Sequence, residues 1–166
     1  MVATTTIATV VGEMTTEPSP TMTSALDEQE LLAWRGMLQA HATVTRQLDA
    51  QMQAEHGLSV SAYEVLMFLA DTDGHRLRMA EIADRVLLSR SGLTRLVDRL
   101  VALGLVVRNA CADDGRGSFA ELTTAGEAKL VAARRTHLQG VREFFLDRLT
   151  QDDQRALGAA WERIAE

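Results

Sequence analysis

Cysteine is nearly absent from this sequence of 166 residues, which contains only Cys111. A single thiol cannot close an intrachain disulfide or build a thiolate metal site, and it suits a reducing cytoplasm. The four histidines lie on separate predicted helices or turns. The sequence carries no Ser/His/Asp spacing, phosphate-binding loop or zinc motif. We therefore expect a cytoplasmic protein that is not an enzyme, with no catalytic residue, no metal and no cofactor.

Prolines and long hydrophobic runs are also scarce. The two prolines, Pro18 and Pro20, lie in a threonine-rich segment over residues 1–24 that has few residues to bury. Its apolar run, residues 7–11, is too short for a signal sequence and has no basic segment before it. We predict that residues 1–24 form a disordered or loosely held arm and that no part of the chain enters a membrane. The chain is long enough for one domain with a core, but short for two.

A helix with an arginine-bearing face is predicted over residues 90–103. Leucine and valine recur there at i, i+3, i+4 and i+7 from Leu93, which gives one buried stripe. Ser89 is suited to cap its first turn, and Gly104 is suited to end it. The opposite face carries small hydrogen-bonding residues near the N-terminus together with arginines, the side chains that read the major groove of DNA. An ordinary amphipathic surface helix is the alternative.

The segments around this helix complete a winged helix. Apolar residues over 79–86 fit the core face of a shorter helix, and a short turn separates the two helices. Two strands, 105–109 and 118–122, are predicted next, and the polar Asp/Gly-rich segment 110–117 joins them. Residues 76–78 are candidates for a third short strand.

Two stretches of this region resemble the DNA-binding core of the MarR family of bacterial transcription regulators. They are LLSRSGLTRLVDRLVALGLVVR, residues 87–108, and DDGRGSFAELTTAG, residues 113–126. With its flanking helices the resemblance extends over about residues 27–166. It implies a mainly α fold with a small β wing, in which a winged helix-turn-helix domain is flanked by N- and C-terminal dimerisation helices. It also implies a repressor that a small ligand relieves.

Helical patterns flank the core at both ends of the chain and carry more apolar residues than one small core needs. A two-fold homodimer is the simplest arrangement that covers them. A monomer whose terminal helices pack on each other is the alternative. The other helices are expected over residues 26–56, 62–70, 126–149 and 150–164. The MarR-type domain is expected over residues 25–166. Within it, residues 25–57 and 124–166 are the dimerisation segments and residues 61–123 are the winged-helix region.

Charge is distributed unevenly along the chain. The net charge is −6, yet between His75 and Thr123 eight arginines stand against six acidic residues, with no lysine. Arginine binds guanine and phosphate in bidentate geometry. A local arginine face can therefore hold double-stranded DNA although the whole chain is acidic.

Nine residues are predicted to contact DNA at a pseudo-palindromic operator. Arg95 is our first candidate for a base contact, whereas Arg99 is equally placed to pair with Asp98 or Glu121. Arg116, on the wing, is expected to enter the minor groove, whose negative potential favours arginine. The predicted contacts are Ser89, Arg90, Ser91, Gly92, Thr94, Arg95, Arg99, Asp114 and Arg116.

The family resemblance also implies a pocket between the dimerisation helices and the winged helix that takes a small aromatic or phenolic effector. Five residues are placed on helices where they can line it: Trp34, Arg35, His41, Tyr63 and Glu64. Burial of Trp34 in a dimer core, and a purely structural role for His41, are the alternatives.

Two other functions stay open at this point. The arginine face of a winged helix can bind an acidic protein in place of DNA. The second alternative is a redox-responsive regulator that acts through Cys111. Against it, the family members that sense peroxides carry their cysteine near the start of the first helix.

Overall fold

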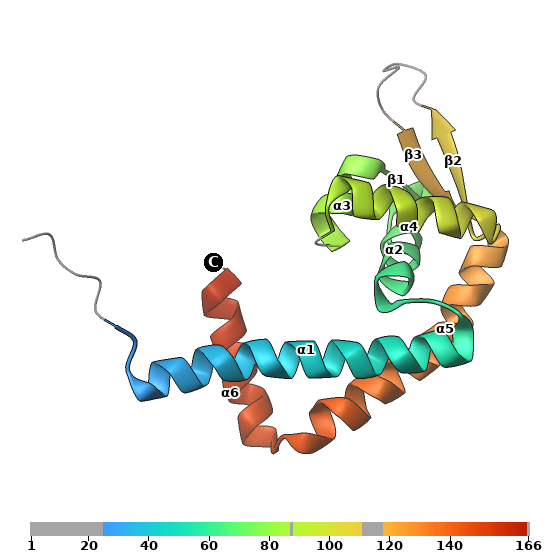
Figure 1. Cartoon of the computed structure of the whole chain (residues 1–166). Helices are drawn as coiled ribbons and strands as arrows, with labels where there is room; N and C mark the ends of the chain where they lie inside the picture. Colours follow the sequence, from blue (N-terminus) through green and yellow to red (C-terminus); the bar gives the residue numbers. More distant parts are fainter. Residues whose placement is uncertain (1–24, 87, 111–117, 166) are drawn as a thin grey trace, which may run out of the picture.

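The structure is a computed structural model that describes residues 25–86, 88–110 and 118–165, so the predicted arm over residues 1–24 lies outside it. Its elements are α1 Glu28–His56, α2 Val60–Ala70, η1 Asp73–His75, β1 Arg76–Arg78, α3 Met79–Val86, α4 Arg90–Ala102, β2 Val106–Ala110, β3 Ser118–Leu122, α5 Thr124–Phe144, η2 Leu146–Arg148 and α6 Gln151–Ala165. Helices α2 to α4 and the sheet form one part, and the long helices α1 and α5 with α6 form the other (Figure 1). The mainly α fold with a small β wing is confirmed.

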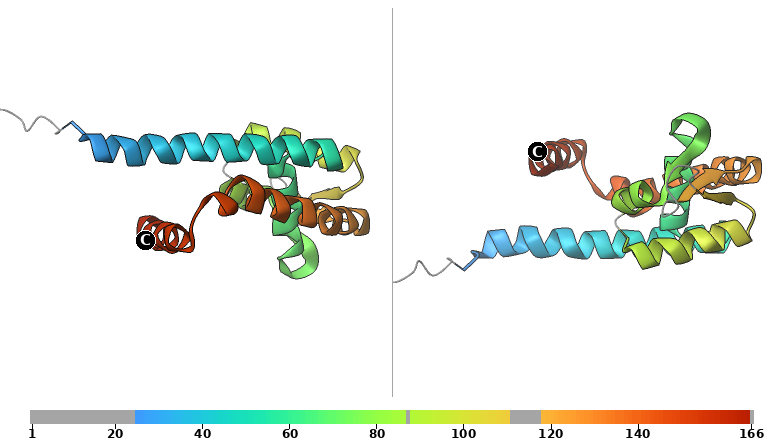
Figure 2. Two further views of the ribbon diagram at one scale, coloured as in Figure 1. Left: turned by 90° about the horizontal axis from the view of Figure 1, so that it is seen from below. Right: turned by 90° about the horizontal axis from the view of Figure 1, so that it is seen from above.

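Helix α1 is bounded by local signals at both ends. The side chain of Asp27 accepts a hydrogen bond from the Glu30 backbone N–H at 2.8 Å, and the Glu30 carboxylate accepts one from the Asp27 N–H at 2.8 Å. This capping box satisfies two amide groups that a helix start otherwise leaves free. Gly57 ends the helix in the left-handed region, with φ 64°, which glycine adopts at low cost. The resulting helix extends well beyond the winged-helix part (Figures 1 and 2).

One apolar core holds the winged-helix part together. The four residues that the helical period placed on the buried face of α4 are all buried, and they pack with apolar residues of α2, α3, the sheet and α5. The largest side chains with almost no exposed surface are Met52, Leu58, Leu66, Leu69, Ile82, Leu93, Leu100, Val65, Val97 and Val106.

The sheet has three antiparallel strands in the order β1-β3-β2, which confirms the predicted third strand over residues 76–78. Leu77 pairs with Ala120, and both are buried. Since side chains alternate across a strand, Arg76 and Arg78 lie on the opposite, exposed face. Phe119, the register partner of Arg78, shares that face.

Helix α5 is shorter than its sequence pattern indicates. We predicted a helix as far as Leu149, but α5 ends at Phe144, because Phe145 has φ −130° and ψ −66°, outside the helical region. The Gln154 side chain donates to the Leu146 carbonyl at 3.1 Å, which satisfies a group freed by the break. Thr150 and Asp153 then cap each other at the start of α6. The prediction was wrong because periodic apolar residues report burial and not backbone continuity.

Helices α1 and α5 approach closely through small and polar residues. A Cβ atom at Gly140 would lie 2.7 Å from Leu48 Cδ2, so only glycine fits there without a shift. Buried Thr136 donates from Oγ1 to Glu55 Oε2 at 2.9 Å, and its Oγ1 also lies 2.8 Å from His56 Nε2. Among the helices that the structure describes, none is long and apolar enough to cross a membrane.

Candidate nucleic-acid interface

Helix α4 presents the predicted polar residues on its outer side and begins with a satisfied cap. Ser89 Oγ accepts from the Gly92 N–H at 3.2 Å and lies 3.3 Å from Ser91 Oγ. Thr94 Oγ1 donates back to the Arg90 carbonyl at 3.0 Å. These bonds fix the first turn, so the hydroxyls are held in place beside the helix N-terminus, where the helix dipole favours an anion.

Three arginines of α4 lie outside its buried stripe. Arg90, Arg95 and Arg99 are all exposed, and no carboxylate of the described residues lies within ion-pair distance of any of them. Their positive charge is therefore available to an external anion such as a DNA phosphate or a guanine base edge. At 3.6 residues per turn, Arg95 and Arg99 lie on one side of α4, whereas Arg90, in the first turn, lies about half a turn around the helix from Arg99.

The alternative partners considered for Arg99 are engaged elsewhere. Asp98 Oδ1 lies 3.1 Å from Arg108 Nη1, and Glu121 Oε2 accepts from Asn109 Nδ2 at 3.0 Å. Neither of the suggested pairs with Arg99 forms; each carboxylate instead contacts a side chain of β2. The guanidinium group of Arg99 stays with the exposed face.

Arg108 ties the helix to the wing and was not identified from the sequence. Its Nη1 binds Asp98 on α4, and its Nε donates to Ser118 Oγ on β3 at 3.1 Å. Both charged side chains are partly exposed, and such pairs add only about 0–1 kcal/mol to stability. We therefore assign the contact to orientation: one planar guanidinium group sets the position of α4 relative to the two wing strands.

The wing tip carries the remaining predicted contacts. Asp114 and Arg116, and with them Cys111, lie outside the described residues. Their assigned roles stay predictions.

The five predicted effector residues occupy separate places within one subunit. Trp34 and Arg35 are exposed on the N-terminal half of α1, about 33 Å along the helix from its end at His56. Tyr63 and Glu64 follow that end, in the first turns of α2. A single subunit therefore does not bring Trp34 beside Tyr63, and a pocket that contains both requires a second subunit.

Tyr63 and His137 form one of the contacts between α2 and α5. Their rings stack, with centroids 4.5 Å apart and planes inclined by 22°. His137 Nδ1 is buried, and no described residue bonds to it. Burial lowers the pKa of His137 and raises the pKa of Glu64. Burial also raises the pKa of Tyr63, an effect that Arg134 opposes and Asp71 reinforces.

We expect the substitution His137→Phe to make the protein less sensitive to acid. Because the pKa of His137 lies below 6.5 in the folded state, the unfolded chain takes up the proton first as the pH falls. The free energy of unfolding therefore decreases from about pH 6.5 down to the lowered pKa, and then levels off. Phenylalanine keeps a stacked ring and cannot titrate. Urea unfolding at about pH 7.5 and pH 5.5 is expected to show a larger loss for wild type than for the variant; equal losses contradict this assignment.

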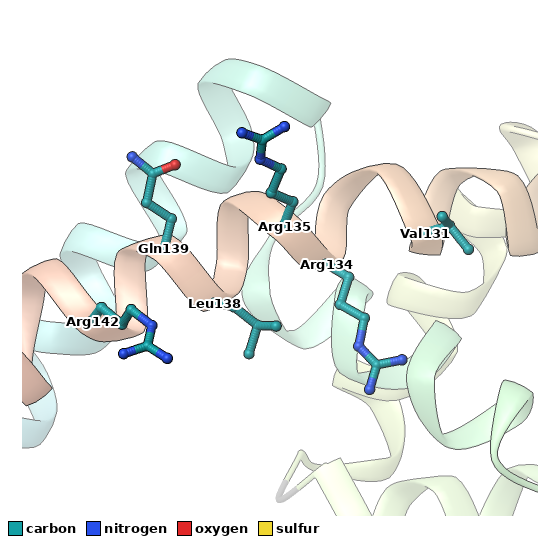
Figure 3. A pocket seen from close by; sticks show the side chains of 6 residues that line it. All are labelled: Val131, Arg134, Arg135, Leu138, Gln139 and Arg142. Carbon is teal, nitrogen blue, oxygen red and sulfur yellow. The ribbon is translucent and has the colours of Figure 1, made fainter.

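An apolar groove of about 610 Å³ lies between α1 and α6 and includes one of the predicted effector residues, His41. The apolar side chains around it come from α1, from the segment after α5 and from α6. They include Leu38, Phe145, Leu149, Leu157 and Trp161. A second depression runs along α5 and is lined by side chains of that helix alone (Figure 3). The groove is therefore the more enclosed of the two surfaces.

Comparisons with known proteins agree on one family. A model described as "MarR family" matches residues 56–117. The HTH-type transcriptional repressor YetL of Bacillus subtilis is 33% identical over 115 residues, which cover 68% of this chain and 69% of YetL. The crystal structure of Sco3205, a MarR family transcriptional regulator from Streptomyces coelicolor in complex with DNA, is 36% identical with a TM-score of 0.78, and the match covers 86% of this chain and 90% of that one. AbsC, a MarR family regulator from the same organism, is 34% identical with a TM-score of 0.76, over 86% and 96% of the two chains.

Proposed function

Because this chain belongs to the MarR family of DNA-binding transcriptional regulators, we propose that it acts as a homodimer on a pseudo-palindromic operator. In this proposal α4 lies in the major groove, and the wing over residues 110–117 reaches the minor groove. The relatives are regulators, which confirms the expectation that the protein is not an enzyme.

The exposed arginine face of α4 is the observation that carries this proposal. Ser89 and Ser91 are held at the helix start, and Arg90, Arg95 and Arg99 have no carboxylate partner among the described residues. A protein that neutralises several phosphates loses duplex affinity steeply as salt rises. A module that binds an acidic protein through the same arginines has no such affinity for duplex DNA, so a salt titration separates the two functions.

The proposed dimer is supported by apolar surface that one subunit leaves uncovered. Leu32 is 73% exposed, Trp34 55% and Ile164 74%, and none of the described residues of α6 is buried. Amphipathic helices gain most of their stability from packing an apolar face. A second copy seated against α1, α6 and the groove between them covers these residues. Two-fold symmetry then sets the recognition helices about 34–36 Å apart, one turn of DNA.

The substitution Trp161→Asp tests the dimer. Trp161 lines the apolar groove, and a buried tryptophan anchor typically contributes about 2 kcal/mol or more to an interface, which is about 30-fold in dissociation constant. Sedimentation velocity across a concentration series is expected to show a dimer for wild type and a shift toward monomer for the variant. Arg163→Asp, on the same helix but outside the groove, is the matched control. A monomeric wild type, or a variant that dimerises as tightly as wild type, contradicts the proposal.

We further propose that the protein represses its target genes and that a small aromatic or phenolic effector releases it. YetL, whose name describes it as a repressor, supports the first part. The predicted effector residues are Trp34, Arg35, His41, Tyr63 and Glu64. Since a single subunit separates Trp34 from Tyr63, an effector site that contains both depends on the proposed dimer.

A further inference from the structure

Two arginines of β1 converge on one aromatic ring of β3, that of Phe119. The guanidinium carbon of Arg76 lies 5.1 Å from the centre of the Phe119 ring, and that of Arg78 lies 5.3 Å from it. Both arginines are exposed, while Leu77 between them is 5% exposed and packs into the core. Strand alternation and the pairing of Arg78 with Phe119 therefore place two cations side by side on the outer face of the sheet.

Stability alone does not account for the position of Arg76 in this pair. An exposed arginine beside a phenylalanine ring contributes about 0.5–1 kcal/mol, and one arginine is enough to obtain it. Two guanidinium groups beside the same ring also repel each other. Arg76 has no carboxylate within ion-pair distance among the described residues. Its register partner Glu121 accepts a hydrogen bond from Asn109 at 3.0 Å.

The position of this pair fits a polyanion that already lies along α4. The sheet, α3 and α4 form the part of the molecule that is turned away from α1 (Figure 1). Strand β1 leads directly into α3, whose first residue, Met79, follows Arg78. Phe119 is the second residue of β3, close to the wing segment that is proposed to reach the minor groove.

We propose that Arg76 and Arg78, held by Phe119, contact the DNA phosphate backbone beside the wing, as a site separate from α4. This rests on the proposed function and adds a contact surface to it. The Phe119 ring restricts both guanidinium groups before DNA arrives, which lowers the entropy lost on binding. Contacts to phosphate fix the register of a protein on the duplex and carry no sequence information, so the site contributes affinity and not base preference.

The test uses the full-length protein with Arg76→Gln, Arg78→Gln and the double variant. Duplex affinity is measured by fluorescence anisotropy over a range of salt concentrations, for an operator and for an unrelated duplex. Removing one arginine–phosphate contact reduces the slope of log K against log salt by about 0.9, so a single substitution, present in both subunits of a dimer, changes the slope by about 1.8. Both duplexes are expected to lose affinity by the same factor.

Three controls make the result specific. Arg135→Gln removes an exposed arginine from α5 and is expected to leave the slope unchanged. The double variant Arg76→Lys with Arg78→Lys keeps both charges and is expected to restore most of the slope, and circular dichroism verifies that each variant is folded. Phe119→Leu keeps the arginines but releases them, so it lowers affinity with little change in slope.

Two results overturn this inference while leaving the proposed function intact. The first is that the double variant Arg76→Gln with Arg78→Gln shows the same slope of log K against log salt as the wild-type protein. The second is a loss confined to the operator duplex, which assigns the arginines to base recognition. If the wild-type protein binds no duplex at all, the proposed function itself fails.

Discussion

Arg95→Ala is expected to weaken operator binding by about 1–3 kcal/mol per half-site, which is about 5- to 150-fold, and to relax sequence preference at one base position in each half. Arg95 is exposed on the outer side of α4, and no carboxylate of the described residues neutralises it. Its neighbours Leu96 and Val97 are buried in the core, so the backbone that carries Arg95 is fixed. A bidentate contact to guanine loses its full effect when the guanidinium group is removed.

The measurement is an anisotropy titration of wild type and variant against the operator and against duplexes with single base changes. Arg135→Ala, which removes an exposed arginine from α5 (Figure 3), controls for the change in net charge. A variant that loses the same factor on every duplex contradicts the base contact and reassigns Arg95 to a phosphate.

Gly126→Ala is expected to destabilise the fold by about 3 kcal/mol, at the upper end of what overpacking costs. Gly126 lies in the first turn of α5, where the helix passes directly over the Leu105 carbonyl. A Cβ atom there would clash with that carbonyl oxygen and would lie 2.7 Å from Leu122 Cδ1. The oxygen cannot move away freely, because it accepts the Thr123 N–H at 3.1 Å. The added methyl group of alanine is therefore expected to push α5 away from Leu105 and from Leu122 at the end of β3.

The control is Gly158→Ala on α6, where an added Cβ meets none of the described atoms within 4 Å. Alanine at that helical position is expected to be neutral, or to stabilise by up to about 1 kcal/mol. Thermal and urea unfolding of the two variants measure the difference. Equal effects at Gly126 and Gly158 contradict the packing described here.

The elements that were predicted well are those specified by residues within one helical turn of each other. Ser89 and Gly57 set the ends of α4 and α1 through contacts that are local in sequence. The buried stripe of α4 follows from its 3.6-residue period, and the short strand over residues 76–78 follows from polar, apolar and polar residues in alternation.

Long-range pairings could not be predicted from the sequence because they depend on strand register. Arg108 meets Asp98 and Ser118 only when β2 and β3 are aligned as observed. Phe119 lies more than forty residues after Arg76 and Arg78 in the sequence, and antiparallel pairing alone brings them together. Charge patterns identify arginines but not their partners.

The predicted effector site shows a second limit of prediction from the sequence, which concerns the residues that can meet within one subunit. Trp34 and Tyr63 were grouped because the family resemblance implies a pocket between the dimerisation helices and the winged helix, and each residue lies on a helix that could line it. Helix α1 extends about 33 Å from Trp34 to its end at His56, and α2 begins only after the turn at Gly57 and rises away from α1 (Figure 1). The length of a helix, and not its amphipathic pattern, decides which residues meet.

Selection of bound duplexes from a random pool at physiological salt tests the central claim most directly. A dimer that presents two copies of α4 is expected to enrich a pseudo-palindrome whose half-sites are centred about 10 base pairs, or a multiple of that spacing, apart. Recovery of an unenriched pool, or of a single half-site without symmetry, would contradict the proposal that two arginine-bearing helices read DNA together.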